Sequence, residues 1–463
     1  MVFSTLVFLF IFMPAVLIMY NLSSNRTYKN VILVISSLIF YAWGEPLCIC
    51  LLMISALSDY TIGRIMDKHS GQWQAKLGLI MSLVIDLGIL IIFKYSGFFA
   101  GNIGRLLGIE IAFKGLPLPL GISFYTFQTL SYTIDVYRGE VKVQKSFLKY
   151  LVYLSMFPQL VAGPIVRYID IENQIDTRVV TIEKFSAGIS RFMIGLFKKV
   201  VLANGAGSVA SLILDGNLSD LSSATAWLGM FMYSFQIYFD FSGYSDMAIG
   251  LGKMFGFDFH ENFNYPYISK NVTEFWRRWH ISLGTFFRDY VYIPLGGNRR
   301  HQMLNIFIVW FLTGFWHGAS WNFILWGLYY GVLLIIEKKC FNGALMRMPA
   351  VLGTVYNAVI TLIGWSIFYF TDMGRLVGFF RAGFGMNGLF DYRALSIAAS
   401  NIWFIAVLLF ASTPIPKKIF TAIDKRNPDV SAALSHMGII CIFILCFILL
   451  IGQTYNPFLY FRF

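Results

Sequence analysis

Charged side chains are scarce in this sequence of 463 residues, of which 13% are Asp, Glu, Lys or Arg and 57% are hydrophobic. Soluble domains carry about 25% charged residues, so the composition excludes an ordinary soluble protein of this length. Residues 1–20 and 437–451 contain no charge at all. Because a helix needs about 20 apolar residues to cross the bilayer core, the sequence predicts an all-α polytopic membrane protein.

Cysteine is also infrequent, and the five cysteines lie in or beside apolar runs. The spacing of Cys48 and Cys50 fits neither a zinc knuckle nor a redox motif. We therefore expect buried, unreactive thiols.

Several motifs that would identify an enzyme class are absent. There is no G-x-x-x-x-G-K-[ST] phosphate loop, no G-x-S-x-G nucleophile elbow and no H-E-x-x-H zinc helix. His260, His280 and His301 are not at ligand spacing. The sequence therefore predicts no metal site and no permanently bound cofactor.

Positive charge exceeds negative charge by 12, but the basic residues lie mostly in short segments between apolar runs. That distribution follows the positive-inside rule and argues against nucleic-acid binding. A break of the apolar stretch 31–58 at residues 44–46 places the basic segments before and after it in the cytoplasm. With the basic segment 416–426, this predicts extracytoplasmic termini. Residues 1–20 lack a basic n-region and a cleavage site, so we interpret them as a retained helix. Residues 94–220 and 338–400 give no clear topology.

We find no internal repeat or long linker, so the sequence predicts one integral-membrane domain over 1–463. Its most polar segment is 257–302, with six Lys or Arg, four Asp or Glu and three of the six histidines. We expect this segment to be cytoplasmic and partly re-entrant. Residues 222–256 form a long helix-like stretch.

His317 lies between the apolar runs 303–316 and 321–336, at the depth of the hydrocarbon core. An ionisable residue at that depth is costly and indicates function. Neutral imidazole can take a proton from a hydroxyl near pH 7, as a general base must. A histidine that joins two helices by a hydrogen bond fits the same depth equally well.

A polar cluster, WRRWHISLGTFFRDY, occupies residues 276–290. On one helix, Trp276 and His280 would share a face, as would Arg277 and Arg288. Guanidinium groups beside aromatic rings suit a phosphate-bearing ligand. The alternative is an interfacial helix with arginines at lipid headgroups and tryptophans in an aromatic belt. That alternative leaves Asp289 unexplained.

Two further polar islands interrupt apolar runs, at residues 119–139 and 235–252. In the second, Asp240 and Tyr244 are four residues apart, close to Gln236. Such residues line a polar tunnel or hydrogen-bond neighbouring helices. We favour the hydrogen bond for any single residue and the tunnel for the set.

Two blocks, FWRRWHISLGTFFRDYVYIPLGGNR and FWHGASWNFILWG, resemble the membrane-bound O-acyltransferase superfamily. More narrowly, they resemble its bacterial branch of alginate and polysaccharide O-acetyltransferases. FYAWGEP, SFYTFQTLSYTIDVYRG, FPQLVAGPIVRY, FDFSGYSDMAIGLG and the terminal FLYFRF also resemble that branch. The likeness runs from about residue 35 to residue 463 and includes no motif between about 338 and 400.

The resemblance implies a ring of about 11–13 transmembrane and re-entrant helices around a central funnel. It implies that His317 is the catalytic histidine and that His280 occupies the second catalytic position, facing His317. Acyl donor would enter from the cytoplasm, and acceptor would be reached from the opposite face. The other residues assigned to the donor site and tunnel are Trp276, Arg277, Arg278, Arg288, Asp289, Trp316, Asn322, Gln236, Asp240 and Tyr244.

The resemblance also implies acetyl-CoA as a substrate and a bacterial cytoplasmic membrane as the location. Relatives pass the acyl group to a separate extracytoplasmic hydrolase-like (SGNH-type) acetyltransferase. We therefore expect that kind of partner protein and a surface polysaccharide, together with membrane lipids.

Two other functions compete with this interpretation. Within the same superfamily, D-alanyl transfer for teichoic acid modification would use a carrier-protein thioester as donor. A transporter would use the intramembrane polar residues as a substrate path, but transporters often show paired repeats, which we do not find.

Overall fold

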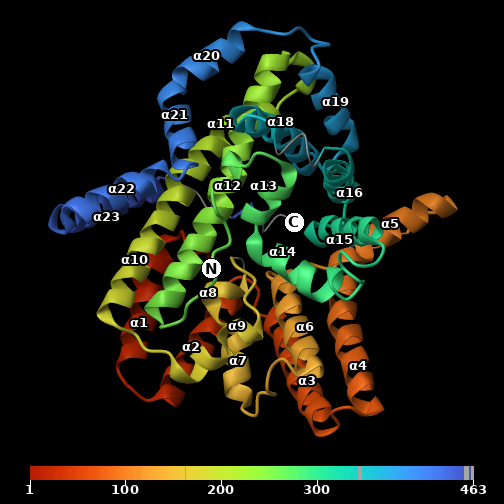
Figure 1. The fold of residues 1–463 in the computed structure, drawn as a ribbon, viewed down its shortest axis with the longest axis vertical. Coiled ribbons are helices and arrows are strands. Elements are labelled where there is room, and N and C mark those ends of the chain that lie inside the picture. The colour runs from red at the N-terminus through yellow and green to blue at the C-terminus, as the bar shows by residue number, and fades with distance from the viewer. Residues whose placement is uncertain (112, 114, 162, 342–346, 453–457, 460–463) are drawn as a thin grey trace.

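The computed structural model describes residues 1–463 except 112, 114, 162, 342–346, 453–457 and 460–463. All regular secondary structure in these described ranges is helical (Figure 1). This confirms the predicted all-α class. Residues 460–463 of the FLYFRF motif and residue 162 of FPQLVAGPIVRY lie outside the described residues, as does most of the segment that separates the last helix from Phe458.

The first half of the chain contains mostly long helices with short π-helical or 3₁₀ segments between them. In chain order they are η1 (Phe8–Phe12), α1 (Met13–Asn21), α2 (Arg26–Ala42), α3 (Cys48–Lys68), α4 (Trp73–Leu90), η2 (Ile91–Tyr95), α5 (Ser96–Leu107), α6 (Ile122–Arg138), α7 (Phe147–Ser155), α8 (Phe157–Leu160), α9 (Tyr168–Thr177), α10 (Ile182–Phe197), η3 (Lys198–Ala203), α11 (Asn204–Leu214) and η4 (Leu218–Asp220).

The second half begins with the longest helix and continues with shorter ones. These are α12 (Ser223–Met254), η5 (Pro266–Ile268), α13 (Val272–Arg278), α14 (Ile281–Phe287), η6 (Arg288–Tyr292), α15 (Gln302–His317), α16 (Trp321–Ile336), η7 (Glu337–Phe341), α18 (Ala350–Tyr369), α19 (Met373–Gly383), α20 (Tyr392–Ser400), α21 (Ile402–Ala411), α22 (Ile415–Arg426) and α23 (Pro428–Ile451).

Five described helical segments are long and apolar enough to cross a membrane, or six if the bent pair α20 and α21 is one span. They are Cys48–Lys68, Trp73–Leu107, Ile182–Leu214, Ala350–Tyr369 and Pro428–Ile451. Other apolar helices are shorter; α15 and α16 have 16 residues each. The chain is therefore a multi-pass membrane protein, whereas the funnel remains a prediction.

The predicted break at residues 44–46 is confirmed. α2 ends at Ala42 and α3 begins at Cys48, and the Glu45 carboxylate between them accepts the Leu120 N–H at 2.9 Å. The basic segment that follows the apolar stretch 31–58 begins within a helix, because Arg64 and Lys68 lie on the last turns of α3. A basic side chain is favourable at a helix C-terminus because the helix dipole is negative there.

Helix α12 confirms the long helical stretch predicted for 222–256, and it packs closely on α10. Glycines make this approach possible: a Cβ at Gly195 would lie 2.5 Å from the Gly243 carbonyl oxygen. A Cβ at Gly250 would lie 2.6 Å from the Phe192 amide nitrogen. Small residues at helix contacts are typical of membrane proteins. The packing fixes α12 beside the polar segment that follows it (Figure 1).

The thiols differ from the prediction. Cys446 is buried and Cys48 is partly buried, but Cys50, Cys340 and Cys441 are exposed. Cys50 and Cys441 lie on candidate membrane spans, where an apolar environment outside the protein suits a small hydrophobic side chain.

Candidate active site

His280 lies at a break between two short helices. α13 ends at Arg278, α14 begins at Ile281, and His280 has a left-handed backbone with φ of 45°. The prediction that Trp276 and His280 share one helical face is therefore wrong. A non-glycine residue in this conformation costs of order 1–3 kcal/mol and is commonly found at functional sites.

Asn262 holds this break in place. Its side-chain oxygen accepts hydrogen bonds from the Ser282 amide at 3.2 Å and the Ser282 hydroxyl at 2.9 Å. The same oxygen lies 3.1 Å from His280 Nδ1. The Ile281 amide donates to the Asn262 carbonyl at 3.0 Å. These contacts compensate the strained backbone and orient the imidazole.

His317 is the last residue of α15 and is only 4% exposed. Aromatic rings surround its imidazole, with Trp316 and Trp326 each 4.9 Å away between centroids and Phe368 at 5.3 Å. All three contacts are close to perpendicular. The imidazole is therefore buried in a rigid aromatic environment.

The two histidines approach each other around Trp316. The Trp316 ring lies 6.1 Å from His280 and 4.9 Å from His317. Trp316 itself is 5% exposed, and its ring stacks on Phe127 at 5.3 Å. The polar segment 257–302 and the end of α15 thus meet at one tryptophan.

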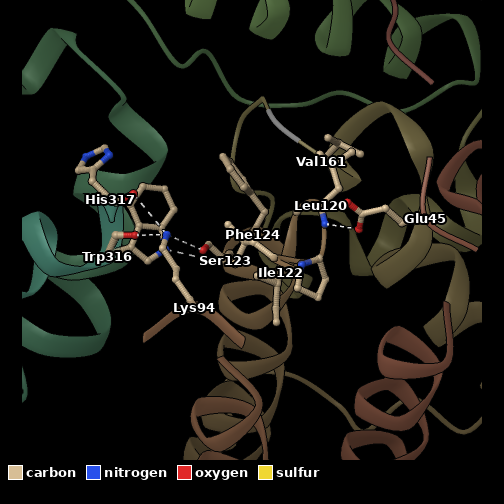
Figure 2. A pocket seen from close by; sticks show the side chains of 12 residues that line it. Glu45, Lys94, Leu120, Ile122, Ser123, Phe124, Val161, Trp316 and His317 are labelled. Atoms are coloured by element: carbon tan, nitrogen blue, oxygen red, sulfur yellow. Dashed lines mark hydrogen bonds between the residues drawn. The ribbon is translucent and has the colours of Figure 1, made fainter. Parts of the chain in front are cut away.

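Each histidine lines a different cavity. His280 lines a cavity of about 1060 Å³, together with Trp276, Arg277 and Arg288. His317 lines a cavity of about 110 Å³, whose polar walls include Glu45, Lys94 and Ser123 (Figure 2). Trp316 lines the smaller cavity. Each histidine of the pair therefore has a cavity of its own.

Residues 38–371 match the model of the membrane-bound O-acyltransferase family, MBOAT. The chain belongs to this family.

Two relatives are similar over most of their length. A probable alginate O-acetylase AlgI of Azotobacter vinelandii is 36% identical, with all of both chains covered. A peptidoglycan O-acetyltransferase of Helicobacter pylori is 33% identical over 84% of this chain and 81% of its own. A teichoic acid D-alanyltransferase of Bacillus subtilis is 32% identical over only 48% of this chain and 58% of its own. The chain is therefore a membrane O-acyltransferase.

The arginines predicted for the donor site of this O-acyltransferase differ in their surroundings. Arg277 is exposed and lines the large cavity, with no carboxylate in salt-bridge distance among the described residues. Arg288 also lines it but pairs with Asp289 at 2.6 Å. Arg278 lies outside the cavity walls and pairs with Glu274 at 2.9 Å. Arg277 is thus the arginine that faces the cavity without a paired carboxylate.

Asp289 belongs to an ionic network beside the cavity. It accepts from Arg288 and from Arg167, the latter at 2.9 Å, and Arg167 also pairs with Asp170. Burial alone raises the pKa of Asp170, but hydrogen bonds from His260 and Arg167 outweigh it and lower that pKa to about 2. The hydrogen bond to Asp170 raises the pKa of His260 in turn.

Trp276 packs inside an aromatic cluster. Its ring centroid lies 4.7 Å from Trp310, 4.9 Å from Tyr330 and 5.4 Å from Trp326. Because Trp326 also contacts His317, this cluster connects a wall of the large cavity to the buried histidine.

The remaining predicted tunnel residues take part in helix packing and line neither described cavity. Asp240 pairs with Lys199 at 2.5 Å and accepts the Leu459 amide. The Asn322 amide donates to the Ile367 and Phe368 carbonyls at 3.3 and 3.1 Å. Both side chains therefore form polar contacts between elements of the fold, which was the alternative to lining a tunnel.

Tyr244 and Gln236, both on α12, also pack against other parts of the fold. Tyr244 stacks on Phe3 at 4.6 Å, and Gln236 lies against Gly207 of α11. Their assignment to a tunnel remains a prediction.

Sequence reasoning missed Lys94 and Asn262. Lys94 had a readable signal, because it is one of only two charged residues in the apolar run 77–96, and an intramembrane charge is costly. Asn262 had none, since an asparagine in a polar loop is ordinary and only the fold brings it to His280.

Proposed function

We propose that this chain transfers an acetyl group from cytoplasmic acetyl-CoA to a hydroxyl acceptor reached from the opposite face of the membrane. The transfer would serve O-acetylation of an exported polysaccharide, alginate-like or another cell-surface glycan. The observation that carries the proposal is the pair of buried histidines at Trp316, each lining its own cavity. The names of the alginate and peptidoglycan relatives support the acetyl group and the polysaccharide.

In this mechanism, His317 is the general base. It removes the proton from the acceptor hydroxyl as that oxygen attacks the thioester carbonyl carbon. The C–S bond breaks, the thiolate of coenzyme A takes up the proton from the imidazolium, and the ester forms. His280 assists by positioning donor or acceptor and polarising the thioester carbonyl. A positioned acid or base of this kind contributes about 10²–10⁴ in rate.

The large cavity is the proposed donor site. Its volume of about 1060 Å³ suits a ligand the size of a pantetheine arm with its phosphates, and Arg277 and Arg288 are suited to bind phosphate. Trp276 and its aromatic neighbours would line the path of the acyl end. In this proposal acetyl-CoA is a substrate, and no metal or resident cofactor takes part.

The acceptor side requires a further protein. We propose an extracytoplasmic hydrolase-like (SGNH-type) acetyltransferase that receives the acetyl group and modifies the polymer. The chain would act as one domain in a bacterial cytoplasmic membrane, with segment 257–302 on the cytoplasmic side and both termini outside.

D-alanyl transfer from a carrier protein is the second candidate. The teichoic acid relative matches only 48% of this chain, whereas the two acetyltransferase relatives match 84% and 100%. The comparison of coverage favours acetyl transfer.

Coenzyme A release tests the proposal. Protein purified in detergent is given acetyl-CoA with water or a small alcohol as acceptor, as wild type, His317→Ala and His436→Ala. His436 is exposed on α23 and lines neither cavity, so this variant controls for loss of a histidine. We expect release by wild type and His436→Ala and none by folded His317→Ala. Equal release by all three would remove His317 from the mechanism, and no release by any would favour a carrier-bound donor.

A further inference from the structure

Lys94 lies inside the continuous helical segment Trp73–Leu107, which is long and apolar enough to cross a membrane. A charged side chain in such a segment needs polar partners and commonly indicates function. The membrane-facing environment offers none, so the partners of the Lys94 ammonium group show what the residue is for.

Those partners are at the end of α15. The last turn of a helix leaves its carbonyl oxygens without amide donors from the same helix. After His317 the chain continues through Gly318 in an extended conformation, with φ of −174°. The carbonyls of Phe315, Trp316 and His317 therefore need donors from elsewhere.

Two consecutive residues supply these donors. Lys94 Nζ donates to the Trp316 carbonyl at 2.6 Å and lies 3.3 Å from the His317 carbonyl oxygen. The Tyr95 hydroxyl donates to the Phe315 carbonyl at 2.6 Å. Figure 2 shows the Lys94 ammonium group between Ser123 and the carbonyls of Trp316 and His317. Three successive carbonyls at the end of α15 are thus satisfied by one short segment.

A local irregularity makes this arrangement possible. Residues Ile91–Tyr95 form a π-helical turn, η2, between α4 and α5. A π-helical turn changes the angular spacing of successive side chains and is often found at functional sites. Tyr95 also stacks on Phe315, with centroids 4.1 Å apart and planes within 10°. The turn therefore has both a polar and an apolar contact with the end of α15.

Lys94 also lines the small cavity, so a role as a substrate-binding cation must be considered. An ammonium group has three N–H donors. The Ser123 hydroxyl at 3.1 Å and the carbonyls of Trp316 and His317 occupy all three directions. Lys94 is therefore suited to hold the protein's own backbone in place rather than a ligand.

We propose that Lys94 is a positioning residue for acyl transfer: its ammonium group binds the carbonyls that end α15 and thereby fixes the position of His317. This inference rests on the proposed role of His317. A cation is favourable at a helix C-terminus. A displacement of about 1 Å at a reacting group costs about 10²-fold in rate.

The test compares Lys94→Met, Lys94→Arg and Lys76→Met in the coenzyme A release assay. Methionine keeps a long unbranched side chain but removes the donors, whereas arginine retains donors. Lys76 is an exposed lysine on α4 and provides the matched control. We expect Lys94→Met to lower kcat about 10²-fold, with KM for acetyl-CoA little changed. Lys94→Arg should recover much of the lost kcat, and Lys76→Met should match wild type.

Two results would overturn the inference: wild-type kcat in folded Lys94→Met, or a loss confined to KM. If Lys94→Met is not recovered as folded protein, Tyr95→Phe provides the second test of the inference. This variant keeps the ring that stacks on Phe315 and removes one donor to the end of α15. We expect its kcat to fall about tenfold, and an unchanged kcat would contradict the proposed role of this contact. Full activity in His317→Ala would overturn the proposed function and this inference together. Loss in His317→Ala with full activity in Lys94→Met would overturn only this inference.

Discussion

The two candidate histidines, His280 and His317, are fixed by different parts of the fold. His317 ends a regular helix, and the donors that hold that helix end come from Lys94 and Tyr95, more than 200 residues away in the chain. His280 occupies a strained turn, and the side chain that supports it is Asn262, 18 residues away. One histidine therefore depends on long-range packing, and the other on contacts within one polar segment.

The difference teaches how each position responds to substitution. At His317 the backbone is ordinary helix, so a replacement side chain alters chemistry more than conformation. At His280 the backbone has positive φ, so a replacement must also tolerate the left-handed region. Asparagine is several-fold enriched in that region compared with most residues.

The same substitution at both positions gives the largest expected effect. His317→Asn removes the proposed base without changing the helical backbone, and we expect kcat to fall about 10²–10⁴-fold. In His280→Asn the new side chain tolerates positive φ and can still form a hydrogen bond. We therefore expect a clearly smaller loss of kcat than in His317→Asn. The measurement is coenzyme A release at saturating acetyl-CoA, with folding verified by elution and thermal midpoint. Equal losses at both positions would contradict the separate roles.

Asn262→Leu should have the next largest effect. It leaves the buried Ser282 amide and hydroxyl without their acceptor, which costs about 1–3 kcal/mol. We expect a lower thermal midpoint and roughly tenfold lower kcat from the misoriented His280. Asn262→Asp keeps an acceptor oxygen and is the control. If Asn262→Leu retained wild-type kcat, the Asn262 side chain would not be the group that orients His280.

Arg277→Ala should act on the donor and not on the histidines. Loss of a charge-assisted hydrogen bond to phosphate should raise KM for acetyl-CoA about tenfold, with kcat little changed. Arg278→Ala should raise KM less, because Arg278 already pairs with Glu274 outside the cavity walls. Arg105→Ala, on exposed α5, controls for loss of a surface arginine. An equal KM for Arg277→Ala and wild type would place the phosphates elsewhere.

The smallest expected effect is on the pH dependence of stability, through the pair of Asp170 and His260 in the ionic network beside the large cavity. The folded pKa of Asp170 is lowered to about 2, so its contribution is present above the unfolded value of about 3.9 and is lost as pH falls towards 2. The folded pKa of His260 is raised. Its contribution is therefore full below the unfolded value of about 6.5 and is lost as pH rises through the folded value.

His260→Ala should consequently lower the thermal midpoint more at pH 6 than at pH 8. The loss in free energy of unfolding should be no more than about 1 kcal/mol because the pair is partly exposed. Asp170→Asn should lower the thermal midpoint more at pH 7 than at pH 3. The reference is His436→Ala, measured at the same pH values. A His260→Ala deficit that grew with rising pH would contradict the assigned pairing.

Sequence patterns predicted the helical class, the break at residues 44–46 and the long helix α12. These follow from apolar run length and from glycine and proline, which act on the local backbone. The patterns failed where one residue overrides a local preference. The regular spacing of Trp276 and His280 suggested one helix, but the contacts of Asn262 stabilise a left-handed turn between them.

For the site, His317 was predicted from residue type and depth, and Arg277 from guanidinium groups beside aromatic rings. The role of His280 was implied by the family resemblance. Asp240 and Asn322 were also assigned to the donor site and tunnel but take part in helix packing, because a buried polar side chain bonds whatever partner packing provides. Residue type alone does not distinguish a cavity wall from a contact between helices.

The sequence by itself determined that this is a multi-pass membrane O-acyltransferase with candidate histidines at 280 and 317, because apolar runs and contiguous motifs are local properties of the chain. Only the tertiary structure decided that both histidines lie close to Trp316, each lining its own cavity, and that Lys94 binds the end of α15. These contacts join residues from 18 to more than 200 positions apart, and a contact at such separation depends on how the helices pack.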